Sequence, residues 1–252
     1  MSGKITGSAG VSGPITTQSS IVPTRKVSIL FIGNSYTFYN DMPKMLVDIS
    51  SSDKGNSTEL YVRSVTKGGI GLKELWESGE ARNLIKSQHW DYVVLQEQSF
   101  WAMFPSSAKT TYAMAANFNY EIRHAGAHTV LYLTWARQPG SHWYSDSDSA
   151  FLKNPEYMQQ QFDYYTNALG KALNADIVPA GDYWAYAIKQ KPGLHLYNND
   201  GSHPGPLGSY LTALLFYRFF TGRDAGQVTY APSGADPAEV GYIKALAARY
   251  VR

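Results

Sequence analysis

Apolar residues are arranged along the chain in short continuous runs, and these runs predict a buried parallel β-sheet. Such runs stand at residues 27–32 (VSILFI), 91–95 (DYVVL) and 129–135 (TVLYLTW), and they are typical of strands buried on both faces. Shorter segments at 59–65 and 176–179 complete a set of five expected strands. Because helical segments separate the strands, we expect an α/β fold: a three-layer α/β/α sandwich around a central, mainly parallel five-stranded sheet.

Apolar residues at helical spacing fill the segments between the expected strands. We expect helices over residues 43–52, 72–87, 107–125, 155–173, 181–189, 205–220 and 237–250. Asp41 stands where the first of these helices would have its N-cap, and Pro43 falls in its first turn. The most apolar stretch, LTALLFYRFF, is too short to cross a membrane and contains Arg218. We therefore predict no membrane span.

The first 26 residues follow no periodic pattern and are rich in Gly, Ser and Thr. This composition is typical of a flexible linker or of vector-derived residues. The alternative is a native arm that packs on the body or on a partner through Ile15, Ile21 and Val22. We place a single folded domain at residues 27–252. The segment contains no apolar core of a signal peptide, and the compartment, cytoplasmic or exported, stays open.

Composition narrows the function classes. Lys and Arg number 22 against 20 Asp and Glu, so the formal net charge is +2 and a nucleic-acid partner is not indicated. The absence of Cys excludes thiolate metal sites and a cysteine nucleophile. The chain has neither a Gly-x-Gly-x-x-Gly after the first strand nor a Walker A segment, and we predict no cofactor. The near-neutral balance favours a neutral or weakly charged substrate.

The first expected strand ends beside a candidate nucleophile. It runs into Gly33-Asn34-Ser35, and a serine just after a buried strand exposes its hydroxyl where backbone N–H groups can hold an oxyanion. A Gly-x-Ser segment alone is common, and Ser35 could simply cap the next helix.

The segment DGSHP supplies the partners that a serine nucleophile needs. One nitrogen of His203 can take the hydroxyl proton while the carboxylate of Asp200 holds the other nitrogen. The alternatives are an Asp-Gly turn in which His203 caps a helix, or a metal site with His195 as a third ligand. We predict no metal.

Together these segments resemble the SGNH hydrolases, the superfamily of GDSL-like esterases and lipases. FIGNSYTF matches the family's first block, with Asn34 in place of the usual Asp, and DGSHP matches its last block. The resemblance spans residue 27 to about residue 217 and is closest to a divergent bacterial branch. It implies a flavodoxin-like fold, with Ser35 as the nucleophile and Asp200 and His203 as its partners.

The resemblance also implies an oxyanion hole, built from the backbone N–H of Ser35 and two further donors. TKGGIGL matches the second block, and Gly69, with Gly68 next, provides its N–H. The third block departs from the family, because VVLQEQS lacks its Gly and Asn. A glutamine amide can donate as an asparagine amide does, so we expect Gln98 to be the third donor, with Gln96 in reserve.

The implied activity is ester hydrolysis of short acyl groups, including O-acetyl groups on a carbohydrate. We expect Trp101, Trp135 and Trp143, in or beside the loops after the third and fourth strands, to bind substrate, although ordinary loop packing would also explain them. Arg137 could contact a polar substrate group or form a surface ion pair. The alternative functions are a catalytically impaired carbohydrate- or ligand-binding module on the same fold, and an acyltransferase. The expected partner is a small-molecule or carbohydrate ester; the oligomeric state stays open.

Overall fold

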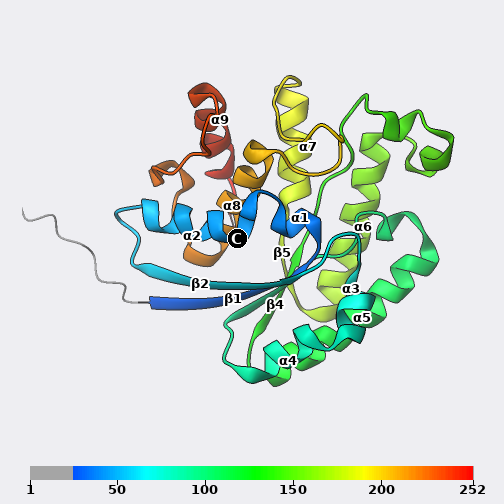
Figure 1. Cartoon of the computed structure of the whole chain (residues 1–252), viewed down its shortest axis with the longest axis vertical. Helices are drawn as coiled ribbons and strands as arrows, with labels where there is room; N and C mark the ends of the chain where they lie inside the picture. The colour runs from blue at the N-terminus through cyan, green and yellow to red at the C-terminus, as the bar shows by residue number, and fades with distance from the viewer. Residues whose placement is uncertain (1–24, 252) are drawn as a thin grey trace, which may run out of the picture.

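A five-stranded parallel sheet forms the centre of the computed structural model, which describes residues 25–251 (Figure 1). The sheet has the order β2-β1-β3-β4-β5, and every neighbouring pair is parallel. The strands are β1 (Arg25–Gly33), β2 (Thr58–Thr66), β3 (Tyr92–Leu95), β4 (His128–Tyr132) and β5 (Asp176–Val178). The fold class predicted from the sequence is confirmed. Because β1 begins at Arg25, the strand includes two residues of the expected arm; Ile15, Ile21 and Val22 lie outside the described residues.

Helices cover both faces of the sheet and make the outer layers of the sandwich (Figure 1). One layer holds α2 (Met42–Ser52), α7 (Ala180–Gln190), α8 (Pro206–Thr221) and α9 (Pro237–Ala247). The other holds α3 (Leu72–Ser78), α4 (Glu80–Ser87), α5 (Pro105–His124) and α6 (Pro155–Leu173). The short helix α1 (Ser35–Phe38) follows β1 directly. Short 3₁₀ turns lie at Tyr39–Asp41, Trp101–Met103, His142–Tyr144, Ser147–Leu152 and Ala225–Gln227.

Strand β1 shows why the apolar runs are continuous. Ile29 and Phe31 point into the core under α2 and α8, whereas Leu30 and Ile32 point into the core on the opposite face. All four side chains have no exposed surface, and burying a side chain of this size contributes about 1.5–3 kcal/mol. A strand covered on both faces therefore has no polar side, as the sequence pattern indicated.

The apolar stretch within α8 is explained by its place in the core. Of the 16 residues in this helix, 13 are buried, because the sheet, α2, α7 and α9 surround it. Among the helices of residues 25–251, none combines the length and apolar character needed to cross a membrane.

Two local expectations from the sequence were wrong, and the expected N-cap of α2 is confirmed in position only. The expected helix over 72–87 is two helices, because Gly79 adopts a φ of 78° that ends α3 before α4 begins. Asp41 occupies the N-cap position of α2 in a left-handed conformation (φ 50°), and its side chain caps no backbone N–H. Strand β4 ends at Tyr132, which leaves Trp135 in the loop beyond it.

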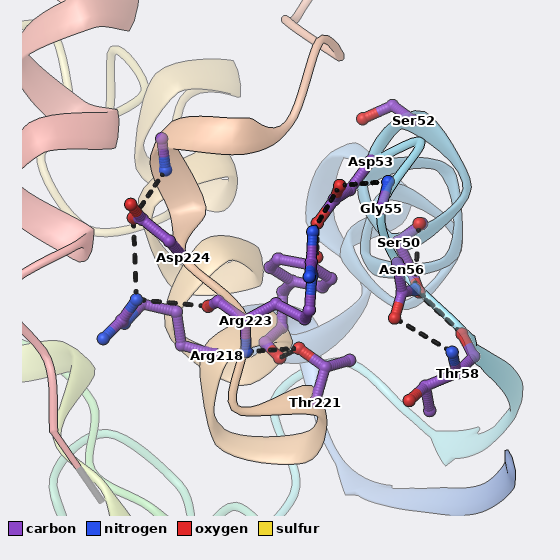
Figure 2. A network of polar contacts seen from close by, with 12 residues as sticks. Ser50, Ser52, Asp53, Gly55, Asn56, Thr58, Arg218, Thr221, Arg223 and Asp224 are labelled. Atoms are coloured by element: carbon purple, nitrogen blue, oxygen red, sulfur yellow. Dashed lines mark hydrogen bonds and ion pairs between the residues drawn. The ribbon is translucent and has the colours of Figure 1, made fainter.

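The two ends of the parallel strands, called here the carboxyl edge and the amino edge of the sheet, carry different polar groups. At the carboxyl ends of the strands lie α1 and the long loops. At the amino end of β2, Arg223 after α8 donates to both carboxylate oxygens of Asp53 at 2.8 and 2.9 Å (Figure 2). The Tyr217 hydroxyl donates to the same carboxylate at 2.6 Å. Burial alone would raise the pKa of Asp53, but these bonds and one from the Gly55 N–H outweigh it and lower that pKa. This charge-balanced cluster ties α2 to the end of α8.

Candidate active site

The turn after β1 holds Ser35 at the carboxyl edge of the sheet. Asn34 shapes the turn in two ways: its side-chain oxygen accepts the Tyr36 N–H at 3.1 Å, and its amide nitrogen donates to the Ile70 carbonyl at 2.9 Å. An ionised aspartate, the residue usual at this position in the resemblance, could make the first bond but not the second. Asn34 therefore ties the turn that carries Ser35 to the loop that contains Gly69.

Ser35, His203 and Asp200 form one hydrogen-bonded chain. The Ser35 hydroxyl oxygen lies 2.8 Å from Nε2 of His203, and Nδ1 of the same ring lies 2.5 Å from Oδ2 of Asp200. Ser35 is only 8% exposed. The structure thus brings together the three side chains that the sequence indicated, with each imidazole nitrogen facing a different partner.

The Asp200 carboxylate also shapes the turn that carries His203. Its Oδ1 accepts the backbone N–H groups of Ser202 and His203, both at 2.9 Å. Burial alone would raise the pKa of Asp200, but the bonds from the His203 ring and these two N–H groups outweigh it and hold the pKa below its usual range. The His203 ring stacks on Tyr39 with ring centroids 4.3 Å apart. Asp200 is therefore ionised near neutral pH and fixes the ring in one orientation.

A cavity of about 500 Å³ opens beside the loops that carry Gly69 and Gln98. Gly69 lines it with a left-handed φ of 77°. The side-chain oxygen of Gln98 accepts the Phe100 N–H at 2.6 Å, so the amide nitrogen is the group that this side chain can offer to a bound molecule. Glu97 buttresses the same loop, since its carboxylate accepts the N–H groups of Leu72 and Gln98 at 3.0 and 2.7 Å. Burial raises the pKa of Glu97 despite these bonds.

Comparison with solved structures identifies proteins that share this architecture. A candidate SGNH hydrolase from Slackia heliotrinireducens matches with a TM-score of 0.65 and 25% identity over 77% of this chain and 98% of that one. The chain has the SGNH hydrolase fold. A DUF4886-family protein from Bacteroides uniformis matches with a TM-score of 0.73 and 19% identity over 88% and 93%. An acetyl xylan esterase matches with a TM-score of 0.55 and 18% identity over 77% and 99%.

The resemblance that the motifs indicated is thereby confirmed, and the low identities fit a divergent branch. The solved structures that share this fold also include a lipase/acylhydrolase from Enterococcus faecalis, at 18% identity and a TM-score of 0.57. No protein-family model matches the sequence. No curated protein matches it either.

The departure in the third SGNH block has a structural counterpart at Gln96. Its side-chain oxygen accepts the Asn34 N–H at 2.8 Å and the Thr37 hydroxyl at 2.9 Å, and its amide nitrogen donates to the Glu97 carbonyl. A Cβ at Gly33 would lie 2.5 Å from the same oxygen and 2.7 Å from the Thr37 hydroxyl oxygen, so a larger residue there would displace this bonded pair. Gln96 is 1% exposed, and these bonds tie its side chain to the turn that carries Ser35, which does not favour its reserve role as an oxyanion donor.

The three tryptophans expected to bind substrate lie in different surroundings. Trp135 is 1% exposed, stacks on Trp184 with ring centroids 3.7 Å apart and donates to the Ser202 carbonyl, so contacts within the protein hold its ring. Trp143 donates to the Asp200 carbonyl at 2.8 Å. The expectation for Trp135 is corrected accordingly: it braces the turn of Asp200 and His203, as Trp143 also does. Trp101 is largely buried and lines the cavity beside Gln98.

Arg137 is the polar residue whose surroundings the sequence did not indicate. It is 3% exposed, which excludes a surface ion pair, and it donates to the hydroxyls of Tyr36 and Ser99. The available signal in the sequence was its place just after the fourth strand, because ligands of open α/β sheets bind at the carboxyl ends of the strands.

His195, considered as a third metal ligand, lies elsewhere. Its Nδ1 is 3.5 Å from Glu239 on α9. Within residues 25–251, no group of three or more His, Asp or Glu side chains converges on a common point as metal ligands would.

Proposed function

We propose that this protein is a serine ester hydrolase that forms an acyl-enzyme on Ser35. The observation that carries the proposal is the 2.8 Å contact between the Ser35 hydroxyl and Nε2 of His203, with Asp200 held at the other nitrogen. A serine hydroxyl is a weak nucleophile without such a base, and the base needs a fixed tautomer. The SGNH fold of the chain supports the same class of reaction.

In the proposed reaction the Ser35 oxygen attacks the ester carbonyl carbon while Nε2 of His203 accepts the hydroxyl proton. Asp200 keeps the Nδ1 proton in place and stabilises the imidazolium. When the tetrahedral intermediate collapses, the bond to the alcohol oxygen breaks and His203 delivers its proton to that oxygen. A water molecule, deprotonated by the same nitrogen, then attacks the acyl-enzyme and releases the acid and Ser35. No cofactor enters these steps.

The negative charge of the tetrahedral intermediate develops on the former carbonyl oxygen, and it needs hydrogen-bond donors that point at that oxygen. We assign these to the N–H groups of Ser35 and Gly69 and to the side-chain amide of Gln98. The position of Gly69 and Gln98 on one cavity supports this assignment, and the engagement of Gln96 leaves Gln98 as the amide of the third block. Loss of one such donor typically lowers kcat by about 10²–10³.

The cavity also supports a choice of substrate class. Its wall combines the aromatic rings of Phe100 and Phe104 with the polar side chains of Lys73, Ser106 and Thr110. Aromatic and hydroxyl groups together suit a sugar that carries a short acyl group. One structural neighbour is an acetyl xylan esterase. We therefore propose short-chain acyl esters, including O-acetyl groups on carbohydrate, as the substrates.

Hydrolysis of p-nitrophenyl acetate and butyrate by the wild type and by Ser35→Ala tests the proposal. We expect wild type to release nitrophenolate steadily and Ser35→Ala to remain at the background rate. Equal rates for the two proteins would contradict the proposal and favour a binding module. Transfer of the acetyl group to an added alcohol, in place of acetate release, would reassign the protein as an acyltransferase.

A further inference from the structure

Arg137 is a buried cation without a carboxylate partner. It lies in the loop after β4 with 3% of its surface exposed, and within residues 25–251 no Asp or Glu comes within ion-pair distance of it. Removing a charged group from water costs several kcal/mol unless other contacts compensate. The contacts of the guanidinium must therefore offset this cost.

Aromatic rings and hydroxyls surround the guanidinium. Its central carbon lies 4.5 Å from the ring centroid of Phe100, 4.8 Å from that of Trp143 and 5.7 Å from that of Tyr36. Nη1 donates to the Tyr36 hydroxyl and Nη2 donates to the Ser99 hydroxyl at 2.8 Å. Cation–π contacts of this kind offset part of the desolvation cost. Nε is buried and has no hydrogen-bond partner in the described part of the chain.

The residues bound by Arg137 are the sequence neighbours of the proposed catalytic groups. Tyr36 follows Ser35, and Ser99 follows Gln98. The Tyr36 hydroxyl also lies 2.8 Å from the hydroxyl of Ser202, which precedes His203. One guanidinium therefore connects, directly or through a single hydroxyl, the segments that carry the nucleophile, the amide donor and the base.

We propose that Arg137 is a positioning residue that holds these three segments in register for ester hydrolysis. This inference rests on the proposed function. A planar guanidinium can donate to two hydroxyls from its two ends at once, whereas an ammonium group is a point donor on a flexible stem. Displacement of reacting groups by about 1 Å can cost about 10²-fold in rate. Because the register affects the transition state more than ground-state binding, the loss falls on kcat rather than on KM.

The test compares Arg137→Met and Arg137→Lys with Arg223→Met, a matched control at the opposite edge of the sheet. Turnover of p-nitrophenyl acetate is measured well below the Tm of each variant. We expect Arg137→Met to lower kcat by about 10²-fold with KM within about twofold, and Arg137→Lys to fall between it and wild type. Arg223→Met is expected to lower Tm and leave kcat unchanged. If kcat of folded Arg137→Met equals that of wild type, the proposal is overturned.

Two smaller changes keep the test decisive if Arg137→Met does not fold. Tyr36→Phe and Ser99→Ala each remove one acceptor of the guanidinium and leave its charge and aromatic contacts in place. We expect each to lower kcat by several-fold at unchanged KM. Wild-type kcat in both variants would overturn the proposal.

A readout independent of turnover separates this inference from the proposed function. The proton between His203 and Asp200 should give a far-downfield proton NMR signal in wild type and in Arg223→Met. We expect this signal to broaden or disappear in Arg137→Met, because the His203 segment loses its anchor; an unchanged signal contradicts the proposal. If wild type hydrolyses no ester and the signal still depends on Arg137, the proposed function fails and the positioning role stands.

Discussion

Arg137 and Arg223 sit at opposite edges of one sheet and differ in how their charge is balanced. Arg223 donates to both oxygens of the Asp53 carboxylate, and the pair connects the ends of α2 and α8 (Figure 2). Arg137 is more deeply buried and binds only hydroxyls and aromatic faces. A balanced pair far from the carboxyl edge serves the stability of the fold. Arg137, an unbalanced cation, binds the sequence neighbours of Ser35 and Gln98, where we propose that the order of the segments matters to chemistry.

The largest expected loss of kcat comes from a change at the carboxyl ends of the strands, where Arg137 lies. Asp200→Asn removes the carboxylate that fixes the His203 ring, and an asparagine amide can hold the wrong tautomer. We expect kcat for p-nitrophenyl acetate to fall by about 10³–10⁴-fold, with the fold retained by circular dichroism. A loss below about tenfold would mean that Asp200 does not orient the base.

Separate replacement of Gln98 and Gln96 distinguishes the proposed oxyanion donor from the residue that supports the turn of Ser35. Gln98→Ala should lower kcat by about 10²–10³-fold, because it removes the amide that we assign as a donor beside the cavity. Gln96→Ala should lower Tm, because it leaves the Asn34 N–H and the Thr37 hydroxyl without their buried acceptor. Full turnover in Gln98→Ala, together with loss of turnover in well-folded Gln96→Ala, would reverse the two roles.

At the opposite edge we expect an effect on stability alone. Arg223→Met leaves the buried Asp53 carboxylate with fewer partners and should lower the free energy of unfolding by about 1–3 kcal/mol. The loss is below that of a fully buried pair because the Arg223 side chain is 36% exposed. Urea denaturation measures it. A large fall in kcat without a change in unfolding free energy would erase the distinction between the two edges.

The smallest effect is the pH dependence of that stability. The folded-state pKa of Asp53 is below its usual value of 3.8, so its bonds stabilise the fold above that pH and are lost as pH falls through the lower folded value. The difference in unfolding free energy between wild type and Asp53→Asn should therefore be full at neutral pH and shrink in acid. A difference that grows as pH falls would contradict the sign.

The features that could be predicted from the sequence are those encoded locally. The apolar runs of the strands follow from burial on two faces, and the Ser35 and His203 segments are short motifs beside predicted elements. The roles of Trp135 and Arg137 depend instead on contacts between distant segments, such as the bond that joins Arg137 to Tyr36 across 101 residues. No periodicity records such a contact, and an aromatic or charged residue in a loop has the same local signature whether it faces solvent or braces a neighbour.

The central claim is that Ser35 is an activated nucleophile, and covalent labelling tests it most directly. A fluorophosphonate is incubated with wild type, Ser35→Ala and Arg223→Met, and the modified residue is located by peptide mass spectrometry. We predict one adduct, on Ser35, in wild type and Arg223→Met, and none in Ser35→Ala. An adduct on another residue, or equal labelling of Ser35→Ala, would contradict the account.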